Sequence, residues 1–451
     1  MFELGLENYL ASFLYVSAIV AVVLALFWRP AVGIFYLAPL IPLQTIRYRM
    51  NEFPLGSSVI YIVLAAVALG LLRRGKPILP RTPWNIPLFL YVGYTFVSLC
   101  MGSFFLDTPL PLWPGDARLS VWADYMTMPA LLLLTASAVE DRRLVKGLVL
   151  LMCLSTLVLD RNFYSAVSGR DFSTFSDDLR EDGNMGYAGV NGLAAFEAQF
   201  AVLLLALAAF ERSRWLKWTY TALAGYSAVC LMYALSRGAY AAFLAGCLFL
   251  GLTKRPFLLV LLAVFASTWA TIVPNAVKSR VETTYDESSG ELEHSAEVRI
   301  ELWRDAEDLI RTSPAVGTGF NTYAYMSRLY NYADTHNYYL KVLVETGVIG
   351  LLLFLWLLAK TFRQGFRLFR RSRDPFLASL GLGLAGWVVA AAVSNCFGDR
   401  WTYFQVNGYM WILCGLASRA FQLEQNEAQV AAEVNQTSGV LPLQEEPAGA
   451  I

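Results

Sequence analysis

An all-α, polytopic membrane protein is the fold class that this sequence predicts, and two observations carry the prediction. Hydrophobic residues make up 57% of the 451 residues, and the mean hydropathy is +0.48. Repeated apolar stretches of about 18 to 23 residues are each long enough to cross the roughly 30 Å hydrocarbon core of a bilayer. Because backbone groups inside lipid must satisfy their own hydrogen bonds, each stretch is predicted to be a helix.

The first apolar stretch follows Glu3 and Glu7 and no basic residue. A cleavable signal starts with positive charge, so this first helix is expected to stay in the protein. About twelve to thirteen membrane helices are predicted in all. We place them near residues 10–28, 31–46, 57–72, 86–105, 119–139, 144–159, 188–210, 216–235, 238–252, 256–273, 338–359, 376–396 and 403–419.

Charge along the chain divides it into one transmembrane domain, residues 1–421, and a polar tail, residues 422–451, which is predicted to be disordered and cytoplasmic. Basic residues gather in alternate short loops and most densely in 360–373, and short basic loops mark the cytoplasmic side of a membrane. Two larger segments, 160–187 and 274–337, fall on the other side. The alternation therefore predicts two loops on the outer side, the second of them large and helical.

Composition indicates neither a cofactor nor a metal. The six cysteines lie in or beside apolar stretches and have no CxxC spacing, which favours neither a metal site nor a disulfide framework. The acidic residues of 160–187 do not match the spacing of a calcium loop and are interpreted as a solvated acidic segment. The formal net charge is zero, and no nucleic-acid partner is expected. The bilayer itself is the partner that composition does indicate.

His336, one of only two histidines, is the first candidate catalytic residue. It lies in a polar turn, 334–337, directly before an apolar run. A histidine at the mouth of a membrane helix meets water, where its near-neutral pKa suits proton transfer. The alternative is a polar helix cap that contains a histidine. His294, in the large hydrophilic loop, has no such position.

Three arginines and one glutamate are the other charged candidates. Ser295 to Thr312 has the pattern of an amphipathic helix, and Arg299 falls within its apolar arc. A cation on a buried face needs a partner, although it could instead snorkel to water. Arg237 lies at a very short turn between two apolar runs on the outer side, where topology anchoring predicts no arginine. Glu345 could orient a neighbouring cation or form a structural salt bridge, and Arg280 is a further cation of the large loop.

These residue types together favour chemistry on a lipid-linked diphosphate. The planar fork of arginine suits bidentate binding of phosphate oxygens. A lipid-linked diphosphate places its charge at the membrane surface, and a sugar attached to it can be transferred once that charge is stabilised. His336 would take the proton of the acceptor hydroxyl, and a protonated His336 that helps to hold the diphosphate is the competing hypothesis. The Gly317–Phe320 segment has a GxG pattern without a strand–helix context and is interpreted as a turn.

Several short motifs resemble, in order and spacing, the bacterial O-antigen ligase/polymerase family over about residues 295–355, and Ser236-Arg237-Gly238 resembles the membrane-edge arginine of that family. The motifs are Arg299-x-x-x-Trp303, Ser313-Pro314-x-x-Gly317-x-Gly319-Phe320, His336-Asn337-x-x-Leu340, and Glu345-x-Gly347 with Gly350.

The resemblance implies an inverting, GT-C-like membrane glycosyltransferase that needs neither nucleotide nor metal. It implies an undecaprenyl-diphosphate-linked glycan as donor and a glycan or lipid A-core as acceptor. It also implies a bacterial inner-membrane protein with a periplasmic site, so that the outer loops 160–187 and 274–337 would be periplasmic. Carried over by position, Arg237 and Arg299 hold the diphosphate, with Arg280 as the alternative to Arg299, and His336 serves the acceptor. Asn337 would fix the acceptor or the imidazole, and Glu345 completes the predicted substrate-binding residues.

The motifs leave several functions open. Ligases, polymerases and protein O-oligosaccharyltransferases share them, and the short polar tail favours the first two. A transporter or flippase for lipid-linked sugar is the alternative without bond chemistry, although such proteins often show internal repeats and a midplane site, and no repeat is apparent here. A scaffold without catalysis would leave the outer arginines without a role.

Overall fold

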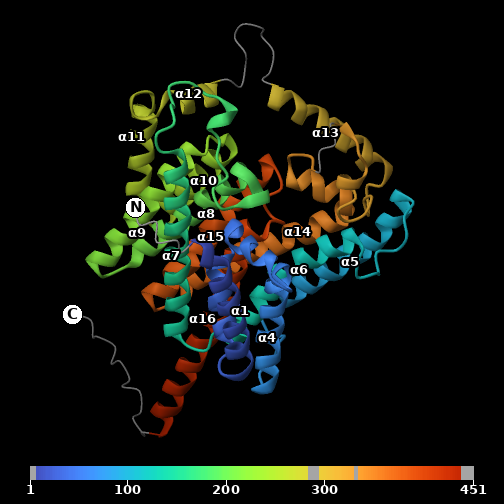
Figure 1. Ribbon diagram of the computed structural model, residues 1–451. Coiled ribbons are helices and arrows are strands. Elements are labelled where there is room, and N and C mark those ends of the chain that lie inside the picture. The colour runs from blue at the N-terminus through green and yellow to red at the C-terminus, as the bar shows by residue number, and fades with distance from the viewer. Residues whose placement is uncertain (1–6, 283–293, 330–333, 438–451) are drawn as a thin grey trace, which may run out of the picture.

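The protein is a bundle of helices that cross one another at various angles (Figure 1). The computed structural model describes residues 7–282, 294–329 and 334–437, and its regular structure within these ranges is helical throughout. The all-α fold class is thereby confirmed. The helices are α1 (Glu7–Phe27), α2 (Ala31–Leu40), α3 (Gln44–Tyr48), α4 (Val59–Arg73), α5 (Asn85–Leu106), α6 (Ala117–Ala138), α7 (Arg142–Val167), α8 (Gly189–Phe210), α9 (Arg214–Tyr233), α10 (Arg237–Thr253), α11 (Phe257–Ile272), α12 (Asn275–Glu282), α13 (His294–Thr312), α14 (Tyr338–Arg371), α15 (Pro375–Ser394) and α16 (Phe404–Thr437), with short 3-10 turns between some of them.

Seven of the described helices are long and apolar enough to cross a membrane, or eight if α11 and α12, which are bent by 107° at their junction, form one span. The protein is therefore a multi-pass membrane protein, with fewer such helices than the twelve to thirteen that the sequence predicts. Two of the predicted spans are apolar helices too short to be counted among these, because α2 has 10 residues and α10 has 17. In α7, basic residues at its start and Asp160 with Arg161 near its end lower the hydropathy of a helix that is otherwise long enough.

The centre of the bundle is formed by α8 and α15, which pack against each other and are buried over most of their length. Large rings fill the space beside them: Phe196 and Phe200 of α8 meet Trp387 of α15 edge-on, at centroid distances of 6.2 and 6.0 Å. By contrast, only 17% of the residues in the apolar stretch of α1 are buried. Between helices in lipid, close packing of this kind replaces the hydrophobic effect as the source of association.

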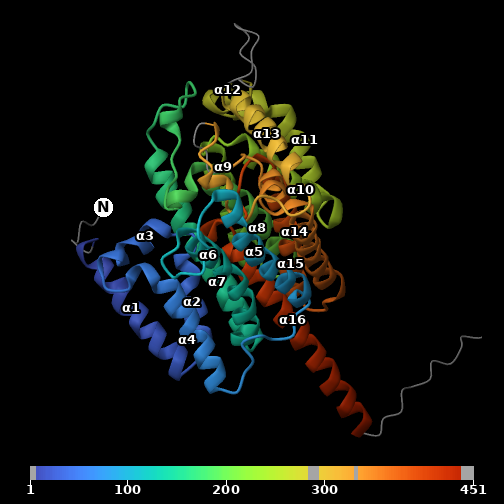
Figure 2. The ribbon, with the colours of Figure 1, turned by 90° about the vertical axis from the view of Figure 1, so that its right-hand side faces the viewer.

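The loops that carry the basic clusters meet at one end of the bundle, which we call the basic end. Lys76, after α4, pairs with Glu140 at 2.6 Å, and Arg142 at the start of α7 pairs with Asp374 before α15 at 3.0 Å and with Glu427 of α16 at 2.7 Å. Helices α12 and α13 lie at the opposite end (Figures 1 and 2). The alternation of basic and mixed loops in the sequence thus corresponds to two ends of the fold.

Helix α16 continues to Thr437, into the segment 422–451 for which composition predicts disorder. Glu424 accepts hydrogen bonds from the Ser372 hydroxyl at 2.5 Å and from the Arg373 backbone, and Glu427 pairs with Arg142. These contacts hold the first turns beyond the apolar part of α16 against the basic end. Residues 438–451 lie outside the described part of the chain.

Helix α14 is broken at Gly347, where φ is 62° and ψ is −171°. A Cβ there would lie 2.2 Å from the carbonyl oxygen of Ala315, so only glycine fits. The loop that follows α13 crosses this break and takes over its backbone hydrogen bonds: the amides of Thr318 and Gly319 donate to the carbonyls of Val344 and Glu345, each at 2.8 Å. A break inside a membrane helix is tolerated when neighbouring groups satisfy its backbone in this way.

The Gly317–Phe320 segment is therefore a turn, as the sequence predicts. Two further donors, from α5, bond to carbonyl oxygens at the break in α14. The Tyr94 hydroxyl donates to that of Thr346 at 2.8 Å, and the Ser98 hydroxyl donates to that of Glu345 at 3.1 Å. The outer loop and the membrane helix α14 are consequently locked together. This fixes the position of α13 relative to the turn that precedes α14.

Candidate functional site

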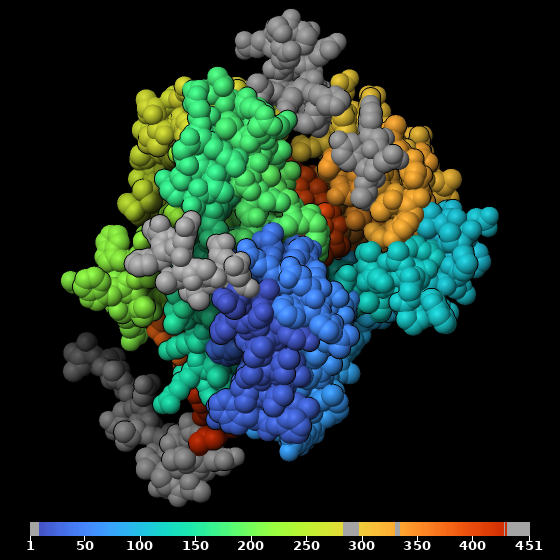
Figure 3. All heavy atoms as spheres, in the orientation of Figure 1, coloured from blue at the N-terminus to red at the C-terminus, as the bar shows by residue number. Residues whose placement is uncertain are grey.

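A cavity of about 210 Å³ lies at the end of the bundle opposite the basic end. In Figure 3 the surface is hollowed between the green and orange parts of the chain, and red residues show at the bottom of the hollow. Among the described residues that line the cavity, none is acidic. Its charged and titratable lining residues are Arg180, Arg237, Arg280, Arg299, His336 and Arg400.

Arg237 is the first residue of α10, directly after the short turn that follows α9. The turn is as short as the sequence predicts, and Leu235 adopts a φ of 52° within it. The Ser236 hydroxyl donates to the side-chain oxygen of Asn191 on α8 at 2.9 Å, which ties the turn to the centre of the bundle. Arg237 is thereby held at the rim of the membrane helices and faces the cavity.

Arg299 is carried by α13, whose bounds of His294–Thr312 confirm the predicted amphipathic helix. Val298, Leu302 and Ala306 on its apolar face are buried. The Trp303 indole, one turn after Arg299, donates to the carbonyl oxygen of Thr335 at 3.1 Å. This bond fixes α13 beside the turn that contains His336, which explains why a cation within the apolar arc faces a polar cavity.

Arg280 lies at the end of the short helix α12 and is largely buried. Its guanidinium lies 4.5 Å from the centroid of the Phe175 ring, a distance at which the cation is attracted to the ring face. The amide of Ala276 donates to the carbonyl oxygen of Phe172 at 3.0 Å and fixes α12 against the segment after α7. The sequence left Arg280 and Arg299 as alternatives, and both line the cavity.

His336 is held in an unusual backbone conformation, with a φ of 52°. Left-handed φ values are strained for a residue with a side chain and persist only where the surroundings impose them. Here the Asp334 carboxylate imposes it, because its Oδ1 accepts the backbone N–H of His336 at 2.6 Å and lies 3.2 Å from the imidazole Nδ1. One side chain thus fixes both the backbone and the ring.

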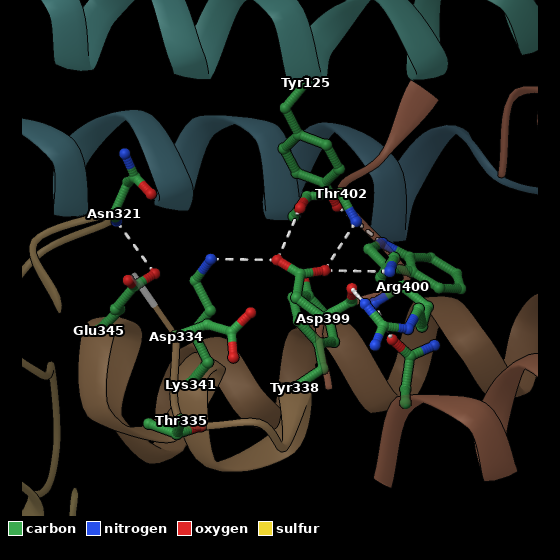
Figure 4. Close-up of polar contacts among 12 residues, drawn as sticks. Tyr125, Asn321, Asp334, Thr335, Tyr338, Lys341, Glu345, Asp399, Arg400 and Thr402 are labelled. Atoms are coloured by element: carbon green, nitrogen blue, oxygen red, sulfur yellow. Dashed lines mark hydrogen bonds and ion pairs between the residues drawn. The ribbon is translucent and has the colours of Figure 1, made fainter. Parts of the chain in front are cut away.

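The Asp334 carboxylate stays ionised at this position. Burial raises its pKa, but the hydrogen bond with His336 and the charge of Lys341 outweigh burial and hold the pKa well below its usual range. Figure 4 shows Asp334 beside Lys341. A negative charge therefore lies directly against the imidazole Nδ1.

A buried ion pair supports the floor of the site (Figure 4). The Lys341 Nζ, one turn into α14, lies 3.0 Å from the Asp399 Oδ2 in the loop before α16. The same carboxylate accepts the backbone N–H groups of Trp401 and Thr402, each at 3.0 Å, and the Thr402 hydroxyl at 2.6 Å. With all of these partners, the carboxylate fixes the 395–402 loop to the start of α14.

Two predicted substrate-binding residues do not line the cavity. The side-chain oxygen of Asn337 accepts the backbone N–H groups of Tyr339 and Leu340, at 3.1 and 3.3 Å, and so caps the N-terminus of α14. Glu345 is buried at the break in α14, where its Oε2 accepts the backbone N–H of Asn321 at 3.0 Å. Both side chains hold the framework on which the cavity residues are mounted.

Arg180 and Arg400 line the cavity but were not singled out in the sequence. Arg180 belongs to the acidic segment that was interpreted as solvated, and Arg400 to the short outer loop before α16. The placement of both depends on long-range folding. A cation among acids and a cation in a short loop both have the pattern of surface residues, so little in the sequence indicates either arginine.

Five arginines and a histidine line one cavity at one end of the helical bundle, and guanidinium groups suit the binding of an anionic group. The family model described as O-antigen ligase matches residues 222–355. This match confirms the resemblance to the O-antigen ligase/polymerase family over that part of the chain, which carries Arg237, Arg280, Arg299 and His336. It supports O-antigen ligase/polymerase-type activity, that of a glycosyltransferase-type enzyme in a bacterial membrane. No curated protein matches the chain.

Proposed function

We propose that this protein transfers glycan from an undecaprenyl-diphosphate-linked donor to an acceptor hydroxyl at the periplasmic face of the inner membrane, as an O-antigen ligase or polysaccharide polymerase. The observation that carries the proposal is that Arg237, Arg280, Arg299 and His336, from separate segments of the chain, line one cavity. The cavity lies at the end opposite the basic loops, and short basic loops mark the cytoplasmic side.

The cavity suits the charged part of a lipid-linked donor. Its volume of about 210 Å³ lies below the roughly 300–1,000 Å³ of pockets that enclose a drug-sized ligand, so it accommodates a headgroup while lipid tail and glycan extend outside. Guanidinium groups bind phosphate oxygens in a bidentate manner. Arg237 and Arg299 approach from opposite elements, α10 and α13, and Arg280 adds a third cation.

In the proposed reaction the acceptor oxygen attacks the anomeric carbon of the donor sugar from the side opposite the diphosphate. A bond forms between these two atoms, and the bond between the anomeric carbon and the phosphate oxygen breaks. The electron pair leaves with the diphosphate, whose added negative charge the arginines stabilise. His336 takes the acceptor proton, and the configuration at the anomeric carbon is inverted.

Asp334 gives His336 the orientation that this step requires. With Nδ1 facing an ionised carboxylate at 3.2 Å, the ring proton of the neutral imidazole resides on Nδ1, and Nε2 is the accepting nitrogen. The carboxylate also stabilises the imidazolium that forms when the acceptor proton is taken, as in other histidine bases that are paired with a carboxylate. Asp334 is a positioning residue in this scheme.

The decisive experiment is transfer by the purified, lipid-reconstituted protein from a lipid-diphosphate glycan to defined acceptors. Lipid A-core, a second lipid-linked glycan and a peptide distinguish ligase, polymerase and protein O-oligosaccharyltransferase. Movement of the lipid-linked glycan across the vesicle membrane without a new glycosidic bond would favour the transporter instead.

The arginines are tested in the same assay by replacing each in turn with lysine and with alanine. Loss of a charge-assisted hydrogen bond costs about 1.5–3 kcal/mol, so Arg237→Ala and Arg299→Ala should lower kcat/KM about tenfold or more. Lysine should not restore full activity, since a point charge does not reproduce bidentate geometry. Arg280→Ala in parallel decides which arginine is the second ligand. Arg311, exposed on α13 and paired with Glu307 at 2.7 Å, is the matched control.

A further inference from the structure

Two arginines line the cavity in addition to those assigned to the diphosphate, and both lie outside the residues that the O-antigen ligase family model matches. Arg180 comes from the segment between α7 and α8, and Arg400 from the loop between α15 and α16. The two guanidinium groups are near enough for the charge of Arg400 to contribute to lowering the pKa of Arg180, after the larger effects of burial and of Arg280.

The loop that carries Arg400 is built to present this side chain. The backbone N–H of Arg400 donates to the side-chain oxygen of Asn395 at 3.0 Å, and the backbone carbonyl oxygen of Arg400 accepts from the Asn407 side chain. Gly398, with a φ of 143°, leaves the space that the guanidinium uses, because a Cβ there would lie 2.9 Å from its Nη2. The preceding residue, Asp399, is anchored by its bond to Lys341 (Figure 4).

Among the described residues, no carboxylate engages Arg400. Within the described residues, its side chain donates only to the backbone carbonyl of Asp399, from Nη1 at 2.9 Å, and forms no ion pair. The backbone of this loop is fixed on both sides of Arg400, and the Arg400 guanidinium lines a cavity whose described lining residues include no acid. This arrangement has the form of an anion-binding element.

Arg180 is similarly only partly satisfied. Its Nη2 donates to the side-chain oxygen of Asn191 at 2.8 Å, the same oxygen that accepts from Ser236. Its Nη1 is 3.9 Å from Asp177, whose side chain is 81% exposed, and an ion pair so long and so well solvated contributes little. Asn191 therefore aligns Arg180 with the turn of Arg237 without neutralising its charge.

We propose that Arg180 and Arg400 form a second anion subsite, which binds an acidic group carried by the glycan: the carboxylate of an acidic sugar or a phosphate substituent. The inference rests on the proposed function, because it treats the cavity as the place where donor and acceptor glycans meet. The donor diphosphate carries one negative charge on each phosphate, and Arg237, Arg280 and Arg299 already face it. The two remaining cations match an additional oxyanion near the reacting sugars, and a bidentate guanidinium distinguishes such a group from a neutral hydroxyl.

The test compares matched glycans that differ only in one acidic group. Donors and acceptors, each in a neutral form and in a form with a hexuronate or a sugar phosphate, are combined in the reconstituted transfer assay. In Arg180→Gln and Arg400→Gln, the ratio of kcat/KM for acidic over neutral glycan should fall about tenfold or more relative to the unmodified protein. If the ratio falls when the donor is acidic, the group belongs to the donor, and if it falls when the acceptor is acidic, it belongs to the acceptor. Arg304→Gln, on the exposed side of α13 and outside the cavity lining, is the control.

Binding supplies a readout that needs no turnover. The protein should bind a soluble acidic oligosaccharide at least about tenfold more tightly than its neutral counterpart, and Arg400→Gln should remove this preference. Arg400→Lys, which keeps the charge and disturbs the fold least, should retain part of it.

The outcomes separate the subsite from the proposed function. Equal losses with acidic and neutral glycans would assign Arg180 and Arg400 to the diphosphate and overturn the subsite, and unchanged ratios in folded variants would also overturn it. Absence of transfer by the unmodified protein with every donor would contradict the proposed function instead. The binding preference would then still decide whether the two arginines select acidic glycans.

Discussion

Replacement of Asp334 by asparagine removes one negative charge from the site and little else. Asparagine keeps a side-chain oxygen that can accept the His336 backbone N–H, which Asp334 accepts at 2.6 Å. The strained backbone at His336 should therefore persist. What disappears is the ionised oxygen 3.2 Å from the imidazole Nδ1 and its attraction to the protonated ring.

The expected loss follows from the strength of that contact. A hydrogen bond to a charged group contributes about 1.5–3 kcal/mol, and each 1.36 kcal/mol added to a barrier slows a reaction about tenfold. Complete loss would slow transfer about ten- to a hundredfold. Because the amide oxygen still accepts the backbone N–H and holds the ring near its place, we expect a decrease of about tenfold in kcat with little change in donor affinity. Asp334→Ala, which also loses the backbone bond, should be slower and less stable.

The pH–rate profile distinguishes positioning from a general effect on the fold. The pKa of Asp334 is depressed, so its contribution to stability is complete above the unfolded value of about 3.9 and is lost only as the pH falls through the lower folded value. Asp334 therefore remains charged over the whole range in which histidines titrate. The defect of Asp334→Asn is therefore expected over that whole range.

Single-turnover transfer and donor binding, both measured from pH 5 to 9 on the same preparations, provide the assay. The control is Asp171→Asn, an exposed aspartate of the same end of the bundle that accepts the Ser173 backbone N–H at 2.9 Å. An Asp334→Asn variant with an unchanged rate at every pH would refute the assignment of Asp334 to His336. A variant whose main defect is weak donor binding would favour a protonated His336 that holds the diphosphate.

Three further outcomes are expected from the same structure. His336→Ala should abolish or strongly reduce transfer while donor binding remains, and His294→Ala should matter little; normal transfer by His336→Ala would discard a role in catalysis. Gly347→Ala should lower the free energy of unfolding by about 1–3 kcal/mol or more, since its backbone region is open essentially to glycine alone. Gly93→Ala, inside helix α5 and with no atom within 4 Å of the added Cβ, should leave the thermal stability unchanged or slightly higher. A single cysteine introduced at Asp171 should react with an impermeant maleimide from the periplasm and one introduced in the 360–373 segment only from the cytoplasm; the opposite pattern would invert the proposed topology and the mechanism with it.

The fold class follows from the sequence because hydropathy and helix length are local properties. The number of spans does not, since α2 and α10 are too short and α7 is too charged to qualify alone although all three belong to the same bundle. Apolar composition also conceals the break in α14. In the sequence, Gly347 is one glycine in a long apolar run, and the hydrogen bonds that make the break possible come from a loop thirty or so residues earlier.

The site divides in the same way. Arg299 could be identified because it violates the apolar arc of an amphipathic helix, and Arg237 because it lies at a turn where topology does not require a cation. Arg400 also lies in a short loop at that end, but nothing in the sequence near it indicates that its side chain lines the cavity. Its position depends on the bond between Lys341 and Asp399, two residues 58 positions apart in the chain, and no periodicity indicates such a pair. Local rules therefore find the charged residues that are exceptions within their own element and miss those that tertiary contacts bring in.

The motifs that carry the family resemblance also separate by task in this structure. Arg237, Arg299 and His336 face the cavity, whereas Gly319, Glu345 and their neighbours build the crossing between the outer loop and the break in α14. The crossing fixes the start of the loop that leads from α13 to His336, and the Trp303 bond to Thr335 fixes its end. The break in the membrane helix is thus the means by which helix α13, which carries Arg299, is held at a set position relative to His336 in the turn before α14. A variant that repaired the break into a continuous helix would release the loop and should lose transfer through misplacement of Arg299, even with every cavity residue unchanged.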